Sequence, residues 1–297
     1  MRVLISGASG LLGSAFTRAL RAAGHEPLAL VRHAPRAGEV QWDPNLPLEP
    51  AKLADSDAVV HLAGKNIAGR WTEQFKREAL ESRVRGTQTL ATAAAASYRQ
   101  SGHPGVFLCA SGAGYYGNRG DELLTEASSL GQGFLAEVCQ QWEAASAPAS
   151  DAGVRVVNLR TGVVLARDGG ALKPMLLPFQ LGLGGRVGSG KQYWSWISLD
   201  DEIGAILFIL QSQGLRGPVN AVGPAPVRNS EFVRALGKVL HRPTIFPLPE
   251  WVVRGLLGEM GQELLLTSAR VMPAKLAAAG YKFKHVELEE ALRAALG

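Results

Sequence analysis

Short runs of apolar residues alternate along the first half of the chain with longer segments in which apolar residues recur every three or four positions. The short runs predict strands at 2–6, 26–31, 58–62, 106–110 and 154–159. The longer segments predict helices at 14–23, 72–98 and 133–147. Regular alternation of strand and helix favours right-handed crossovers and a parallel, doubly wound sheet.

The pattern changes after residue 162. Glycine and proline are frequent from 168 to 190, and a predicted helix at 199–211 and strand at 218–221 follow. The rest of the chain reads as helices interrupted by prolines. We therefore predict an α/β fold: a doubly wound parallel Rossmann sheet with a smaller, mainly helical C-terminal substrate lobe. The predicted domains are 1–165, which also takes in about 197–223, and a lobe formed by 166–196 and 224–297.

A glycine-rich turn joins the first predicted strand to the first predicted helix. Its glycines are Gly7, Gly10 and Gly13, and they suit a tight turn, close approach of the backbone to a pyrophosphate and close helix–strand packing. The free N–H groups of the following helix favour an anion. The turn therefore predicts a dinucleotide site, whose candidate contacts also include Ser9, Leu11 and Leu12.

The end of the second predicted strand indicates which dinucleotide binds. An acidic residue there would pair with a ribose 2′-hydroxyl, whereas a cation suits a 2′-phosphate. The strand ends in Val31 and Arg32, with no Asp or Glu, and a guanidinium pairs bidentately with phosphate. We predict NADP(H) as the cofactor; the alternative is a solvated arginine at a strand end.

Composition limits the classes of partner. The chain has 297 residues and a net charge of +5, with 31 basic residues scattered among 26 acidic ones, and no Lys/Arg run suggests a nucleic-acid or membrane surface. Cys109 and Cys139 lie in apolar segments and are expected to be free thiols of a cytoplasmic protein. The histidines lack metal-ligand spacing, so no metal is predicted. A small-molecule substrate is expected, and a homodimer is left open.

Several motifs together resemble the atypical epimerase group of the extended short-chain dehydrogenase/reductase superfamily, often labelled epimerase family protein. The resemblance covers essentially the whole chain. It rests on the glycine turn, on Leu62-Ala63-Gly64 and on Ala110-Ser111. The more specific motifs are Glu81-Ser82-Arg83-Val84, Gly112-Ala113-Gly114-Tyr115-Tyr116-Gly117, Leu159-Arg160-Thr161-Gly162 and Gly188-Ser189-Gly190-Lys191-Gln192.

The resemblance implies catalysis by a serine, a tyrosine and a lysine four residues after the tyrosine. Ser111 matches the serine, but the expected helix carries Phe134 and Val138 at the other two positions. Phenylalanine has no proton to give and valine has no charge. Tyr115 and Tyr116, which follow the Ser111 strand, are therefore candidate catalytic phenols; the alternative is that they pack or line the substrate site.

The resemblance also implies cofactor contacts outside the glycine turn. Arg83 is expected to replace the electrostatic contribution of the missing lysine, and its alternative is an exposed helix arginine. Arg160 is expected to face the cofactor or an anionic substrate, or else to cap the sheet. The remaining implied cofactor contacts are Leu62, Ala63, Gly64 and Glu78.

In the lobe, the sequence of residues 184–192 nearly matches that of a phosphate-binding loop. Gln192 stands where a magnesium-binding Ser or Thr would be required, which excludes a nucleoside triphosphatase. In the family interpretation Gln192, Trp194 and Trp196 form walls of the substrate cleft, and aromatic packing is the alternative for the tryptophans.

Two functions follow from these observations. The first is an NADP(H)-dependent nucleoside-diphosphate-sugar epimerase or carbonyl oxidoreductase, with Ser111 polarising the carbonyl and Tyr115, Tyr116 or water supplying the proton. The second is a catalytically silent NADPH-binding sensor or regulatory protein; the resemblance adds cell division as one setting, since some members of the group carry that label. Ser111 and the substrate lobe favour the first, and Phe134 and Val138 favour the second.

Overall fold

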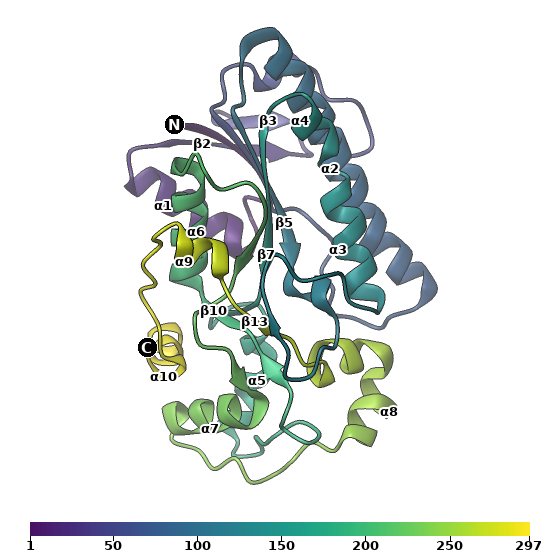
Figure 1. Cartoon of the computed structure of the whole chain (residues 1–297), viewed down its shortest axis with the longest axis vertical. Coiled ribbons are helices and arrows are strands. Elements are labelled where there is room, and N and C mark those ends of the chain that lie inside the picture. The colour runs from purple at the N-terminus through teal and green to yellow at the C-terminus, as the bar shows by residue number, and fades with distance from the viewer.

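A seven-stranded parallel sheet forms the centre of the molecule in the computed structural model, which describes residues 1–297 (Figure 1). The strand order is β11-β7-β5-β4-β1-β2-β3, and every neighbouring pair is parallel. The central strands are apolar and buried on both faces, as a sheet covered by helices requires. The strands are β1 (Arg2–Ser6), β2 (Glu26–Val31), β3 (Glu39–Gln41), β4 (Ala58–His61), β5 (Val106–Gly112), β7 (Arg155–Thr161) and β11 (Gly217–Ala221).

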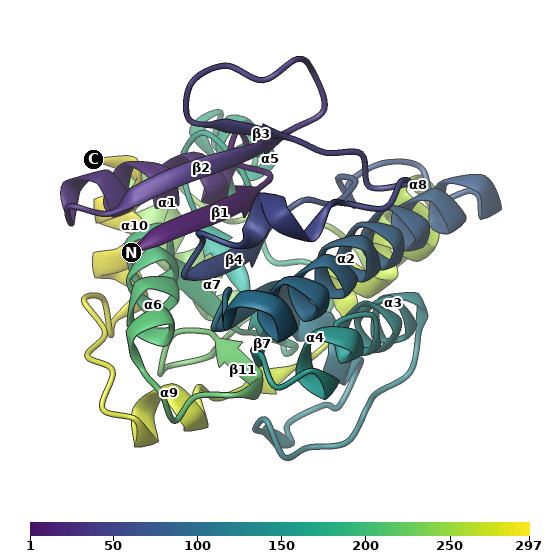
Figure 2. The ribbon, with the colours of Figure 1, turned by 90° about the horizontal axis from the view of Figure 1, so that it is seen from above.

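Helices cover both faces of this sheet (Figures 1 and 2). Helices α1 (Leu11–Ala22) and α6 (Leu199–Gln211) pack together on one face, and the short α9 (Ala274–Ala278) contacts edge strand β11. The other face is covered by α2 (Glu73–Ser101), α3 (Phe134–Ala144) and α4 (Ala147–Asp151), with the 3-10 turns η1 (Pro50–Leu53) and η2 (Ala113–Tyr116) at their ends. The doubly wound Rossmann arrangement predicted from the sequence is confirmed.

A mainly helical region lies below the sheet in Figure 1 and has a hydrophobic core of its own, to which Trp194, Trp196 and Phe232 belong. The predicted domain boundaries remain a prediction. The helical elements of this region are α5 (Leu172–Gln180), α7 (Asn229–Leu240), α8 (Glu250–Gly261), the π-helical turn η3 (Gln262–Leu266) and α10 (Leu288–Leu296). Its short strand pairs are β8 (Val163–Leu165) with β10 (Trp196–Ser198), β9 (Tyr193–Trp194) with β12 (Val227–Arg228), and β6 (Leu123–Leu124) with β13 (Arg270–Val271).

Some predicted bounds were wrong for local reasons. Helix α1 begins at Leu11 and not at residue 14, because Gly10 already serves as its N-cap. The helix predicted at 133–147 is two helices, since Pro148 lacks the N–H that would continue the first and instead occupies the first turn of α4. Strand β3 was missed because three residues carry too little periodicity.

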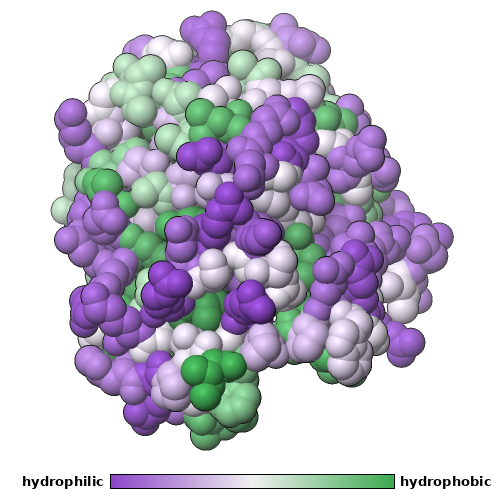
Figure 3. Space-filling model, turned by 60° about the horizontal axis from the view of Figure 1, so that its bottom comes forward, coloured by the Kyte–Doolittle hydropathy of each residue, from purple (hydrophilic) through white to green (hydrophobic).

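The surface is mixed in character. Figure 3 shows a face that is hydrophilic over most of its area, with hydrophobic residues in separate small groups. None of the helices combines the length and the hydropathy needed to cross a bilayer.

Candidate functional site

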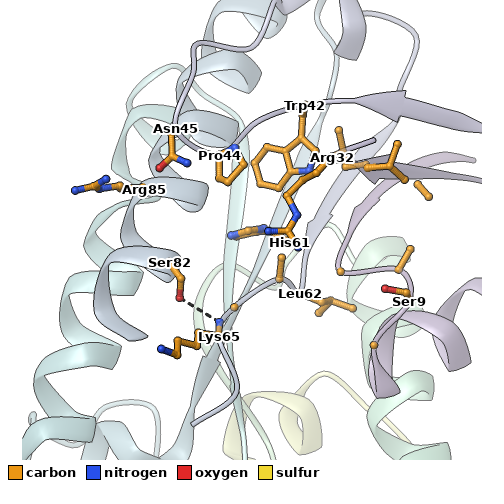
Figure 4. Close-up of a pocket in the computed structure, with 18 of the residues that line it drawn as sticks. Ser9, Arg32, Trp42, Pro44, Asn45, His61, Leu62, Lys65, Ser82 and Arg85 are labelled. Atoms are coloured by element: carbon orange, nitrogen blue, oxygen red, sulfur yellow. Dashed lines mark hydrogen bonds between the residues drawn. The ribbon is translucent and has the colours of Figure 1, made fainter. Parts of the chain in front are cut away.

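A cavity of about 1360 Å³ lies at the carboxyl ends of β1, β2 and β4, where open α/β sheets bind nucleotides (Figure 4). Helix α2 forms its opposite wall through Ser82 and Arg85. The structure brings eight of the predicted cofactor residues together in the lining of this cavity: Gly7, Ser9, Gly10, Arg32, Leu62, Ala63, Gly64 and Glu78.

Close backbone contacts explain why the turn requires glycine at two of its positions. Gly7 has φ 74°, and a Cβ there would stand 2.9 Å from the nitrogen of Ala63. A Cβ at Gly13 would stand 2.1 Å from the carbonyl oxygen of Gly7, so this glycine lets α1 pack against the turn. Gly10 caps α1 without a side-chain hydrogen bond, which leaves the first N–H groups of the helix available to an anion.

Leu11, Leu12 and Gly13 do not line the cavity but form the start of α1 behind it. The side chain of Leu11 lies 3.1 Å from where a Cβ of Gly169 would stand, so it packs under the loop after β8. Their contribution is to hold the turn in place.

Cations surround the outer part of the cavity. Arg32 follows β2, Lys65 follows β4 and Arg85 lies on α2, and all three are among the residues that line the cavity. Three acids also line the cavity, and each already has a partner: Glu39 accepts a hydrogen bond from the backbone nitrogen of Arg36 at 2.9 Å, Glu78 is paired with Lys65 and Glu81 with Arg85. Arg32 has no ion pair. This set of charges suits an anionic ligand with a phosphate near Arg32.

Lys65 and Arg85 were not identified from the sequence. Lys65 is ion-paired with Glu78, and its backbone nitrogen donates to Ser82 Oγ at 3.1 Å (Figure 4). The hydrogen bond from Lys65 is the main reason that the pKa of Glu78 lies below its usual range. Glu78 therefore fixes a cation at the cavity.

His61, which its place inside a strand predicts to be a core residue, is completely buried in β4 beneath the cavity. Burial, assisted by the charge of Arg83, lowers its pKa to about 3, so the ring is neutral. Its Nδ1 shares a hydrogen bond with Ser6 Oγ, and its Nε2 is buried without a partner in the protein. The indole of Trp42 meets the ring edge-on, with centroids 6.1 Å apart. Nε2 points toward Gly86 of α2, where a Cβ would stand 3.4 Å from it, so the ring packs between the sheet and this helix.

Arg83 is half-buried beside Gly64 and is not an exposed helix arginine. Its guanidinium carbon lies 3.4 Å from where a Cβ of Gly64 would stand, and its Nη1 donates to the carbonyl of Ala79 at 2.9 Å. The guanidinium also lies over the ring of Trp142, 4.9 Å from its centroid. Burial lowers its pKa. The arginine thus places a positive charge between the end of β4 and α3.

Ser111 belongs to a buried hydrogen-bond chain at the ends of β5 and β7. Its hydroxyl donates to Glu143 Oε1 at 2.8 Å, and Arg160 holds the same carboxylate through Nε at 2.7 Å and Nη2 at 2.8 Å. Ser111 and Arg160 are register partners in the sheet, and Glu143 reaches them from α3. Burial lowers the pKa of Arg160, but the bonds with Glu143 more than offset it and the net shift is upward. Glu143 was not identified from the sequence.

The two tyrosines occupy different environments. Tyr116 is fully buried: its hydroxyl donates to Asn220 Oδ1 at 2.7 Å and accepts from Arg160 Nη1 at 3.0 Å. Burial raises its pKa, which opposes release of its proton. Tyr115 is half-buried, and the guanidinium of Arg160 lies 3.3 Å from its ring centroid. Arg160 thus anchors this chain and does not line the cofactor cavity.

Phe134 and Val138 stand on α3 as expected. Phe134 packs edge-on against Trp71, with centroids 5.0 Å apart, and Val138 is buried. No phenol replaces Phe134 at this point of the helix.

The three predicted substrate residues separate into two groups. Gln192 lines a second, smaller cavity. Trp194 packs edge-on against Phe232, and Trp196 is 1 % exposed with its indole N–H donating to the carbonyl of Ala225 at 2.9 Å. Neither tryptophan is among the residues that line that cavity, so the packing alternative describes their positions.

Comparison with known proteins agrees with this architecture. The model of the NAD dependent epimerase/dehydratase family matches residues 3–223, and that of a domain of unknown function (DUF1731) matches residues 248–295. Epimerase family protein Mb2239 of Mycobacterium bovis is 47 % identical over 293 residues, 98 % of this chain and 96 % of that protein. The human epimerase family protein SDR39U1 is 38 % identical over 297 residues, which are 99 % of this chain and 99 % of that protein.

Solved structures give the same result. A crystal structure of human SDR39U1 with NADPH superimposes with a TM-score of 0.88 at 36 % identity, covering 99 % of both chains. UDP-N-acetylglucosamine 4-epimerase of Bacillus cereus shares the fold at a TM-score of 0.77 but only 15 % identity, over 99 % of this chain and 95 % of that one. On the strength of the match over residues 3–223 and of these relatives, the chain belongs to the NAD dependent epimerase/dehydratase family.

Proposed function

We propose that this protein is an NADP(H)-dependent oxidoreductase or epimerase that acts on a small hydroxylated carbonyl compound. The cofactor fits the residues present: the glycine turn would hold the pyrophosphate and Arg32 the 2′-phosphate. NADPH in the crystal structure of the similar human protein supports the same assignment. When bound, the nicotinamide supplies or accepts a hydride.

The bond from Ser111 to Glu143 carries the enzymatic part of this proposal. Because the Ser111 hydroxyl donates its proton to a carboxylate, its oxygen is left as an acceptor for a substrate hydroxyl. Ser111 would take the proton of that hydroxyl while passing its own to Glu143 Oε1, and the reverse sequence would protonate a carbonyl. Arg160 holds the Glu143 carboxylate in position through two hydrogen bonds. This pair would do the proton transfer for which the family's tyrosine is missing.

A catalytically silent NADPH-binding protein is the second candidate. It is favoured by the apolar surroundings of Phe134 and Val138, where the family's acid and its lysine are both absent. Cofactor binding without turnover of any hydroxyl or carbonyl compound would support it.

The cofactor assignment is tested with Arg32→Asp. Loss of a charge-assisted bond to phosphate should weaken NADPH about 10- to 100-fold in calorimetric titration, while NADH, which has no 2′-phosphate, should bind no more weakly than before. Arg21→Asp, an exposed change of the same charge in the last turn of α1, should leave both affinities unchanged. Equal losses of NADPH and NADH in Arg32→Asp would contradict the assignment.

A further inference from the structure

A second cavity, of about 380 Å³, lies between the α3 end of the Rossmann sheet and the helical region. It adjoins the position of the missing tyrosine, because Gly133 and Leu135, the neighbours of Phe134, both line it. The loop after η2 contributes Asn118, and the opposite wall comes from Gln192 and the α8–η3 segment. Gly114 and Gly117, in the segment that follows the Ser111 strand, also line it, although Ser111 itself does not. This place makes it the candidate substrate cavity of the proposed enzyme.

Gln192 offers this cavity a fixed hydrogen-bond acceptor. The residue is only 7 % exposed, and its Nε2 donates to the carbonyls of Val187 and Leu265, both at 3.0 Å. Two carbonyl partners determine which end of the amide is nitrogen, so the remaining Oε1 has no partner in the protein. An unpartnered acceptor in a ligand cavity calls for an O–H or N–H donor, which an ionised phosphate cannot supply.

The N-terminus of α3, which borders this cavity, already binds a carboxylate of the protein. The carboxylate of Glu263, on η3, accepts from the backbone nitrogens of Phe134 at 2.7 Å and Leu135 at 2.9 Å. Gly133 makes this approach possible, since a Cβ there would stand 2.6 Å from Glu263 Oε1. A phosphate that sought the N–H groups of α3 would have to displace a carboxylate held by two bonds.

The charges on the cavity wall also oppose an anion. Arg254 is the one cation among the lining residues, and its Nε and Nη2 donate to Glu250 Oε1 at 2.9 and 2.7 Å. Its Nη1 donates to Gln262 Oε1 at 2.8 Å, so the guanidinium is engaged on both sides. With Glu263 the wall carries two carboxylates against one guanidinium, and this excess of negative charge repels a diphosphate.

We propose that this cavity binds an uncharged polyhydroxylated compound, a free sugar, and excludes nucleoside-diphosphate sugars. The proposal rests on the proposed function, since it names the substrate class of that site. A free sugar brings hydroxyl donors for Gln192 Oε1 and has no charge to be repelled by Glu250 and Glu263. The cavity volume stands near the lower end of the range for ligand pockets, about 300–1,000 Å³.

The test is binding, measured apart from turnover. Saturation-transfer NMR on the NADPH-loaded protein would compare a panel of free hexoses and pentoses with UDP-glucose and UDP-galactose. We expect transfer to at least one free sugar and none to the uridine protons of the UDP-sugars. UDP-sugar binding as tight as that of any free sugar overturns the proposal, as does absence of free-sugar binding by protein that binds NADPH. Failure to bind NADPH would instead overturn the proposed function.

Two variants connect binding to the cavity. Gln192→Leu should weaken the free sugar about tenfold, because its acceptor is lost. Glu263→Gln, which keeps an oxygen for one α3 nitrogen but removes the charge, should leave free-sugar binding in place and admit measurable UDP-sugar binding. Glu259→Gln, on α8 outside the lining, is the charge-matched control. Unchanged sugar affinity in folded Gln192→Leu, or unchanged exclusion of UDP-sugars in Glu263→Gln, contradicts the proposal.

Discussion

Replacing Glu143 by Gln is expected to destabilise the protein by about 3–5 kcal/mol, because Arg160 would remain buried without a counter-charge. The side chains of Arg160 and Glu143 are only 3 % and 12 % exposed, so little solvent is available to compensate. Thermal unfolding should show a midpoint lower by roughly 10 °C. Glu137→Gln, an exposed change in the first turn of the same helix, should leave the midpoint unchanged.

A double variant separates stability from proton transfer. Glu143→Leu with Arg160→Met replaces the ion pair by apolar side chains and should recover most of the stability lost by Glu143→Gln, since no charge is left unpaired. If Ser111 passes its proton to Glu143, turnover in this variant should still be lower by about 100-fold or more. Wild-type turnover in the double variant would contradict the proton role, and wild-type stability of Glu143→Gln would contradict the buried ion pair.

The sheet was predictable because its strands are encoded locally. Val3, Leu4 and Ile5 are completely buried, and such apolar runs mark a strand covered on both faces whatever the rest of the chain does. The glycine turn was equally local, because a close approach such as that of Gly13 to the Gly7 carbonyl excludes a side chain. Family membership followed from these same motifs and is confirmed by the match over residues 3–223.

The residues that hold the site together were not predictable, because their partners are distant in sequence. Glu143 lies 32 residues from Ser111, and Asn220 lies 104 residues from the Tyr116 hydroxyl that it binds. Glu263 meets the nitrogen of Phe134 across 129 residues. On the sequence these are an ordinary helix acid, a strand amide and a surface acid. Only the topology of the sheet and the return of the C-terminal segment bring them to one place.

The helix that lacks the family's tyrosine makes two of these contacts. The first turn of α3 holds Glu263 through the backbone of Phe134, while the Phe134 ring packs against Trp71. The last turn of α3 holds Glu143 against Ser111 and Arg160. One helix therefore binds a carboxylate at each end: we propose that the first excludes anions from the cavity beside it and that the second receives the proton of Ser111. The proposed chemistry and the proposed substrate class depend on the same element.

Glu202 should make the stability of the protein fall as the pH rises. The side chain is fully buried in the first turn of α6, where Oε1 accepts from Thr161 Oγ1 at 2.8 Å and Oε2 has no partner. Burial raises its pKa from 4.5 to about 8, and the bond from Thr161 offsets this only in part. Between these two pKa values the folded state holds a proton that the unfolded state has released. Stability therefore decreases through this range and is constant above pH 8.

Glu202→Gln removes this titration while keeping an oxygen for Thr161. The variant should match the wild type near pH 4.5 and exceed it by an amount that grows with pH, reaching on the order of 4 kcal/mol at pH 9, or roughly 10 °C in the unfolding midpoint. Asp200→Asn, in the same helical turn but exposed and paired with Lys284, should not gain stability in this way. A difference between wild type and Glu202→Gln that does not vary from pH 5 to pH 9 would mean that Glu202 is ionised in the folded protein. In that case the Oε2 atom must have a partner, and the end of β7 must be open to solvent or ligand.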